Sequence, residues 1–143
     1  MRHMPKSALL PACLVLTVLM GCDAGRPAVY PVEGRVLISD GTPLRRGIIL
    51  LEAANPEQTN ARGDIGDDGA YKITTFEPND GAMAGKHKVM FSPAVSSADP
   101  RLKYENTIHE RYLDFDTSGL TIDVSAEAKP NRFDFTLDPP EPE

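Results

Sequence analysis

From residue 29 onwards, apolar and polar residues alternate, and Gly, Asp and Pro residues interrupt the alternation at short intervals. Successive side chains of a β-strand point to opposite faces of the sheet, so this pattern predicts half-buried strands. Seven such segments and no convincing long helix predict an all-β domain, a seven-stranded antiparallel β-sandwich. The strands are expected at 30–38, 48–51, 61–65, 71–75, 86–91, 120–125 and 132–137.

Two of these segments predict where the core lies. Residues 48–51 are apolar at every position, which is typical of a central strand covered on both faces. In the last segment Phe133, Phe135 and Leu137 alternate with polar residues. We expect these three side chains to be buried together, with Ile122 and Val124 on a neighbouring strand.

The N-terminal segment has the pattern of a signal peptide. Arg2 and Lys6 precede a 13-residue apolar stretch, Ala8–Met20. That stretch is too short to cross a hydrocarbon core of about 30 Å as a helix, but it suits a signal-peptide core. Residues 1–21 are therefore predicted to be a cleaved signal peptide, followed by a tether at 22–28, a β-sandwich domain at 29–138 and a disordered tail at 139–143.

The signal peptide ends in Leu19-Met20-Gly21-Cys22, which resembles the lipobox of bacterial lipoprotein precursors. A small residue at 21 gives the peptidase access to the bond, and the thiol of Cys22 is the nucleophile that takes a diacylglyceryl group. The resemblance implies three acyl chains, enough for lasting attachment to a membrane. Asp23 resembles the signal that retains some lipoproteins in the inner membrane. The alternatives are an ordinary signal peptide with an incidental cysteine, or a buried core helix.

The composition argues against nucleic acid as a partner, against aromatic stacking of sugars or bases, and against a disulfide. The chain carries a formal charge of −6, and loss of Arg2 and Lys6 makes the mature chain more acidic still, which argues against nucleic acid as a partner. Tryptophan is absent, so stacking platforms for sugars or bases are scarce. Cys13 lies in the leader and Cys22 would be acylated, so no disulfide is expected in the mature fold.

Turn and strand motifs recur in a specific order along residues 30–138. They are Val32-Glu33-Gly34-Arg35-Val36, Asp40-Gly41-Thr42-Pro43-Leu44, Gly66-Asp67-Asp68-Gly69-Ala70-Tyr71, Asp80-Gly81-Ala82 with Gly85 and Val89, and Tyr112 with Thr117-Ser118-Gly119-Leu120. These motifs resemble carboxypeptidase regulatory-like domains of transthyretin-type fold. With the lipobox, the chain is similar to small bacterial lipoproteins built on that domain. The resemblance implies an accessory or binding module.

Three aspartates around Gly66 and Gly69 suggest a calcium loop, but the spacing is wrong for one of the EF-hand kind. Counting from Asp64, position 3 is Gly66 and position 12 is Thr75, so two expected side-chain ligands are missing. A hairpin turn accounts for Asp64, Asp67 and Asp68 better, because Asp and Gly suit its backbone angles. No metal site and no cofactor are expected.

The two histidines of the mature chain, His87 and His109, do not form a ligand pair. His87 alternates with Val89 and Phe91, so we expect it to be packed inward, whereas His109 is expected in a solvated loop. The chain has no Gly-x-Ser-x-Gly elbow. One enzyme of transthyretin fold ends in Tyr-Arg-Gly-Ser, but here the corresponding end is Leu137-Asp138-Pro139-Pro140. An enzyme is therefore not expected.

Residues 92–116 show no strand period, and such a long irregular segment is usually functional or wrongly assigned. Tyr104, Ile108, Tyr112 and Phe115 are spaced as one apolar face of a short helix. This face either caps an open end of the sandwich or forms a contact surface for a partner.

Together these observations predict an exported lipoprotein that faces the periplasm or the exterior, with Asp23 favouring the inner membrane. Its domain is expected to be a non-catalytic accessory or binding module that contacts protein or a cell-envelope polymer. The alternatives are a purely structural envelope component and a hydrolase with an unrecognised site.

Overall fold

The computed structural model describes residues 25–93 and 107–142 of the chain. These residues form an all-β domain with one short helix, as the alternation predicts. No helix in this part of the chain is long and apolar enough to cross a membrane. The strands are β1 (Val32–Ile38), β2 (Gly47–Ala53), β3 (Ala61–Ile65), β4 (Ala70–Lys72), β5 (Gly85–Pro93), β6 (Leu120–Val124), β7 (Asn131–Arg132) and β8 (Phe135–Leu137), and the helix is the 3-10 helix η1 (Glu110–Leu113).

The strands form one mixed sheet in the order β6-β5-β2-β3-β4-β1-β7, and β8 also pairs with β1. The pairs from β6 to β1 are antiparallel, whereas β7 and β8 run parallel to β1. The prediction of seven wholly antiparallel strands is therefore wrong at this edge. Apolar alternation specifies which side chains face the core, but it does not specify the direction of the neighbouring strand.

The segment predicted as one strand at 132–137 is divided by Asp134 into β7 and β8. Its Oδ1 accepts a hydrogen bond of 2.8 Å from the backbone N–H of Arg35, so a side chain takes the place of a backbone acceptor. Side chains of this kind compete with ladder hydrogen bonds. The neighbouring Phe133 N–H still donates to the Glu33 carbonyl, at 3.0 Å, so the segment stays beside β1 across the break.

The core lies inside the curl of the sheet, where β5 and β8 approach each other although they are not neighbours in it. Phe91 of β5 packs edge-on against Phe135 of β8, with ring centroids 5.6 Å apart. The ring of Phe135 also lies 6.3 Å from that of Tyr71 on β4. All three belong to one cluster of buried apolar residues. Side-chain packing therefore joins β5, which lies next to one edge of the curled sheet, to β8 on the other side.

The expected burial of the last strands is confirmed in part. Phe135, Leu137, Ile122 and Val124 are buried, while Phe133 is only half-buried against the core. The expectation that Ile122 and Val124 lie on a neighbouring strand is wrong, since β6 pairs with β5 and the last strands pair with β1. These side chains belong to one core cluster although their strands are not neighbours in the sheet.

Asn131 links the end of β6 to the start of β1. Its side-chain oxygen accepts from the Ser125 N–H at 2.8 Å, and its amide nitrogen donates to the Ser125 carbonyl at 3.1 Å. Its backbone N–H donates to the Pro31 carbonyl at 2.8 Å. The Asn131 amide thus imitates the pair of hydrogen bonds that a neighbouring strand would make, and it ties both edges of the sheet together at one end.

The central strand β2 is not covered equally on its two faces. Ile49 and Leu51 are buried in the core, as expected, whereas Ile48 and Leu50 on the outer face are half-exposed. The outer face carries Met90 of β5 beside Leu50. The expectation of cover on both faces of residues 48–51 is therefore wrong for the part of the chain that is described.

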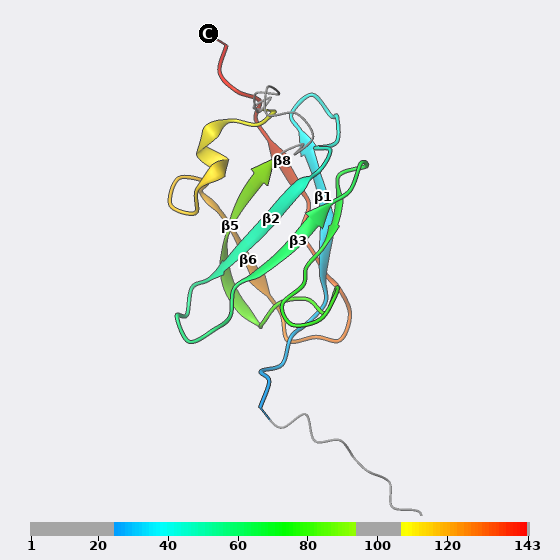
Figure 1. Cartoon of the computed structure of the whole chain (residues 1–143), viewed down its shortest axis with the longest axis vertical. Helices are drawn as coiled ribbons and strands as arrows, with labels where there is room; N and C mark the ends of the chain where they lie inside the picture. Colours follow the sequence, from blue (N-terminus) through cyan, green and yellow to red (C-terminus); the bar gives the residue numbers. More distant parts are fainter. Residues whose placement is uncertain (1–24, 94–106, 143) are drawn as a thin grey trace, which may run out of the picture.

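The chain enters and leaves the domain at opposite ends, as Figure 1 shows. The segment that leads into β1 is at the lower end, and the C-terminal residues after β8 are at the upper end, close to η1. Residues 139–142 have no regular secondary structure. Six residues, 23–28, lie between Cys22 and Val29 in the sequence.

Candidate functional site

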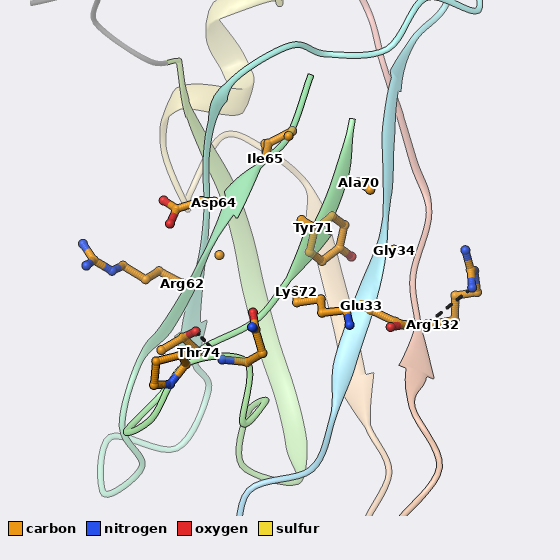
Figure 2. Close-up of a pocket in the computed structure, with 14 residues that line it drawn as sticks. Glu33, Gly34, Arg62, Asp64, Ile65, Ala70, Tyr71, Lys72, Thr74 and Arg132 are labelled. Atoms are coloured by element: carbon orange, nitrogen blue, oxygen red, sulfur yellow. Dashed lines mark hydrogen bonds and ion pairs between the residues drawn. The ribbon is translucent and has the colours of Figure 1, made fainter. Parts of the chain in front are cut away.

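A groove of about 600 Å³ opens over strands β1, β3, β4 and β7. It lies in the size range of small-molecule sites, which is roughly 300–1,000 Å³. Its lining combines basic, acidic and small residues: Glu33, Gly34, Arg62, Gly63, Asp64, Ile65, Gly66, Ala70, Tyr71, Lys72, Thr74, Pro78, Asn79 and Arg132. Figure 2 shows how these side chains are arranged around β3, β4 and β1.

Strand register brings charges of alternating sign into one row across the groove. Arg132 of β7 pairs with Glu33 of β1, and Glu33 pairs with Lys72 of β4. The pairing of Ile65 with Tyr71 places Asp64 of β3 beside Lys72. Within this row only Arg132 and Glu33 approach closely, at 3.5 Å. The row carries two positive and two negative charges, but Lys72 and Asp64 make no ion pair within the described residues.

Arg62 adds a positive charge that the row does not balance. It lies on β3 two residues before Asp64, so both exposed side chains occupy the same face of the strand. Its cross-strand neighbours are Leu50 on β2 and Thr74 after β4, neither of which is charged. A second hollow of about 320 Å³ lies on its other side, against Leu50. Arg62 therefore lines both hollows. Its charge gives the groove one more basic than acidic side chain.

One border of the groove is the loop 74–80, whose backbone is held by the Asp80 side chain. Its carboxylate accepts three backbone hydrogen bonds, from Thr75 at 2.7 Å, Phe76 at 3.0 Å and Glu77 at 2.9 Å. Burial alone would raise the pKa of Asp80, but these backbone donors outweigh it and lower the pKa below its usual value. The Asn79 N–H donates to the Thr74 hydroxyl at 2.9 Å. The loop is thus fixed in place beside Arg62.

Tyr71 supplies the groove with its backbone rather than with its ring. The side chain is 3% exposed, and its hydroxyl donates to the Phe133 carbonyl at 2.6 Å. Burial, followed by the negative charge of Asp134, raises the pKa of this hydroxyl well above its usual value. The ring is consequently part of the core and offers no stacking surface to a ligand.

The three aspartates of the predicted turn do not converge on one point. Asp67 pairs with Arg46 at 3.0 Å and Asp68 with Arg35 at 3.6 Å, while Asp64 lies in the groove. Within residues 25–93 and 107–142, no group of three or more His, Cys, Asp or Glu residues is placed to hold a metal ion. Asp68 Oδ1 accepts the Ala70 N–H at 3.1 Å, as a turn residue does.

Gly69 in this turn has a positive φ of 79°, and a Cβ there would lie 2.4 Å from the Val36 carbonyl oxygen. We expect Gly69→Val to destabilise the domain by about 2–3 kcal/mol, because it combines backbone strain with a steric clash. Chemical denaturation measures the change. Gly41→Val shares a positive φ but meets no atom within 4 Å, so it separates the strain from the clash.

We also expect melting curves in millimolar calcium and in chelator to overlap, since Asp67 and Asp68 are used in separate ion pairs and Asp64 lies apart from them in the groove. A bound ion would raise the melting temperature by mass action. A calcium-dependent rise of several degrees that Asp68→Ala abolishes would contradict the turn interpretation.

The histidines differ in their surroundings. His87 is fully buried, as expected, and its Nε2 lies 2.8 Å from the Met83 carbonyl oxygen. His109 begins η1, where its Nδ1 accepts the Arg111 N–H at 3.1 Å and its Nε2 lies 3.6 Å from Glu141. His109 lies in a loop, as expected, but its side chain is only 25% exposed, so it is less solvated than expected. Neither histidine lines the groove.

The described part of residues 92–116 favours the capping interpretation. Ile108 and Tyr112 are 1% and 3% exposed and belong to the core cluster, whereas Phe115 is half-exposed. The Tyr112 hydroxyl donates to Asp138 at 3.0 Å, which joins η1 to the residue after β8. Tyr104 lies outside the described residues. Cys22 and Asp23 also lie outside them.

The sequence did not single out the basic residues of the groove. Arg62, Lys72 and Arg132 are ordinary outward-facing strand residues by parity, and only the pairing of four strands brings them together. The only sign of the groove in the sequence was that Arg62 and Asp64 share one face of the segment 61–65.

Comparisons with protein-family models, with curated proteins and with solved structures found no match to this chain.

Proposed function

We propose that the protein is an exported lipoprotein whose mature chain is anchored to a bacterial membrane through Cys22. The observation that carries this proposal is the sequence Leu19-Met20-Gly21-Cys22 at the end of a charged and then apolar leader. The first bridge of the domain is at Tyr30, so the lipobox directly precedes the folded part. Asp23 favours retention in the inner membrane.

The anchored domain is a non-catalytic binding module of carboxypeptidase regulatory-like, transthyretin-type sandwich fold. The packing of Phe91 against Phe135 across the core supports two facing layers within the curled sheet. The groove over β1, β3 and β4 offers charged groups for binding a polar ligand. It contains no imidazole to act as a general base, which favours binding over hydrolysis.

Cys22→Ser tests the anchor. The variant should stay in the precursor form with no acyl mass, because the serine hydroxyl does not take the diacylglyceryl group and the lipoprotein peptidase acts on the lipidated precursor. Intact-mass measurement of the protein extracted from membranes reports both properties. Cys13→Ser is the matched control and should leave the mature mass unchanged, since that residue is discarded with the leader.

A wild-type protein that carries no acyl mass, or one cleaved at a site other than the bond before Cys22, would refute the proposal. An identical N-terminus in the wild-type protein and the Cys22→Ser variant would also refute the proposal.

A further inference from the structure

Strand β6 forms one edge of the sheet, and its outer side pairs with no other strand of the described chain. The Lys86 carbonyl of β5 accepts a hydrogen bond of 2.9 Å on the side of β2, so the backbone groups of the next residue, His87, face its pair Ile122 on β6. It follows that the N–H and C=O groups of Thr121 and Asp123 point away from β5. Among the described residues, none of these groups has a hydrogen-bond partner.

Both ends of this open stretch of backbone are closed. The N–H and C=O groups of Ser125 also point away from β5, and the Asn131 side chain bonds to both of them, at 2.8 Å and 3.1 Å. At the other end Gly119 has a positive φ of 66°, so the extended strand does not continue there. The open donors and acceptors are therefore confined to Thr121 and Asp123.

The opposite edge of the sheet is protected against pairing with another strand. It is divided into β7, of two residues, and β8, of three residues, by the side chain of Asp134. Pro139 and Pro140 follow β8 and have no N–H to donate. Short, interrupted edges and prolines are devices that prevent edge-to-edge association. Strand β6 is continuous over five residues, so it is the edge that accepts a further strand.

The sequence of β6 is complementary to itself in the antiparallel direction. When Ile122 lies opposite Ile122 of a second copy, Thr121 lies opposite Asp123 and Leu120 opposite Val124. Thr121 and Asp123 then exchange N–H···O=C bonds with the second copy, which satisfies every open group on both chains. Each Asp123 lies opposite a hydroxyl instead of a carboxylate, and the half-buried Leu120 gains an apolar neighbour.

Other registers of two β6 strands leave groups unsatisfied. A shift of two residues in one direction places Asp123 opposite Asp123 and requires Ser125, whose groups are already bonded to Asn131. A shift in the other direction places Asp123 opposite Gly119, which is not extended. A shift of one residue places open groups opposite residues that already bond β5. Pairing about Ile122 is therefore the register that β6 specifies.

We propose that β6 is an interface between two copies of this chain, which pair antiparallel about Ile122 and join their sheets into one. The outer face of the joined strands suits this arrangement, because Asp123 lies beside Lys86 of its own β5 and Thr121 beside Lys88. No two like charges are directly opposite each other. The interface is isologous, as is usual for a dimer of identical chains.

A single strand buries less surface than the roughly 1,200 Å² of a stable interface, so the pair needs a high local concentration. Attachment to a membrane supplies it, and to that extent the inference rests on the proposed anchor. Since the chain enters at one end of the domain (Figure 1), the two N-terminal segments of the pair lie at opposite ends. Both reach one membrane when the strands lie along its surface, with residues 23–29 as tethers of up to about 24 Å.

Disulfide cross-linking of the full chain in bacterial membranes tests the register. Thr121→Cys and Asp123→Cys chains are produced together and oxidised mildly. In the proposed pair these two positions face each other with Cα atoms about 5.5 Å apart, which a disulfide spans. Each variant alone places its two cysteines roughly 8–9 Å apart, beyond that reach. The mixture should therefore give at least fivefold more covalent dimer than either variant alone, as measured on non-reducing gels.

A proline at position 121 tests the backbone pairing. Thr121→Pro in the Asp123→Cys chain removes an open N–H and leaves the bonds to β5 intact, because proline is tolerated where the N–H of an edge strand faces outward. It should lower the yield of dimer with the Thr121→Cys chain at least fivefold. Thr121→Ala in the same chain is the matched control and should leave the yield unchanged. Melting curves of the two chains show whether the fold is retained.

Absence of dimer in the mixture, or equal yields from the mixture and the single variants, would overturn the inference. Cross-links to another protein in place of a second copy would also overturn it, as would a folded proline variant that cross-links like the alanine control. If the proline variant does not fold, the comparison of the mixture with the single variants still decides. Intact mass reports the anchor separately. An acylated protein that gives no dimer refutes this inference alone, and a dimer of chains without acyl mass refutes the anchor alone.

Discussion

Phe135→Ala should lower the free energy of unfolding by about 3–5 kcal/mol, the usual cost of emptying a buried aromatic site. Phe135 is 9% exposed and contacts two other aromatic rings, those of Phe91 and Tyr71. It belongs to β8, while Phe91 belongs to β5, so the alanine variant removes packing that holds the two sides of the curled sheet together. Denaturant unfolding at equilibrium measures the loss.

Thr136→Ala is the matched control for this prediction. Thr136 is the next residue of β8 and faces outward, where it is exposed. Its substitution should change the free energy of unfolding by no more than about 0.5 kcal/mol. Equal costs for the two variants would mean that the register of β8 is shifted by one residue, since a shift of one residue exchanges the buried and exposed faces.

Gly34→Ala should cost at least about 3 kcal/mol, more than most single substitutions. A Cβ at Gly34 would lie 1.8 Å from the Phe133 carbonyl oxygen and 2.8 Å from the Tyr71 hydroxyl. These two atoms are joined by a hydrogen bond of 2.6 Å, so neither of them is free to move away from a methyl group. The variant must separate β1 from the C-terminal segment or break the Tyr71 hydrogen bond.

Gly66→Ala provides the comparison, because a Cβ there meets only the flexible Asp68 carboxylate at 3.2 Å and the Ala70 carbonyl at 3.6 Å. We expect it to cost about 1 kcal/mol or less. A Tyr71→Phe variant in the Gly34→Ala background tests the mechanism. If the clash with the hydroxyl matters, the double variant should be less destabilised than the sum of the two single variants, as shared contacts imply.

Alternation predicts strand positions and inward faces well, because side-chain parity depends on local sequence alone. His87, Val89 and Phe91 are all buried on the face that the period of two indicates. The division of the last strand was not predictable in this way. Asp134 looks like any outward residue of an alternating strand, and only its distance from the Arg35 N–H reveals that it interrupts the ladder.

The groove was less predictable than the fold, since it depends on the order of the strands. The pattern of residues 61–65 places Arg62 and Asp64 on an outer face, but not beside Lys72 or Glu33. That neighbourhood requires β4 to lie between β3 and β1, and β7 to pair with β1. The sequence contains no turn that specifies the second pairing, because β1 and β7 are far apart along the chain.

The pairing of the first strand with the last two has a consequence for how the domain folds. Arg35 and Asp134 are 99 residues apart in sequence, and their hydrogen bond closes nearly the whole domain into one loop. Contacts between such distant residues slow folding, because the entropy of closing the loop is lost before the contacts form. Until β7 and β8 emerge from the ribosome, β1 lacks both of its parallel partners. A nascent chain therefore stays incompletely folded, and so threadable, until residues 131–137 have left the ribosome.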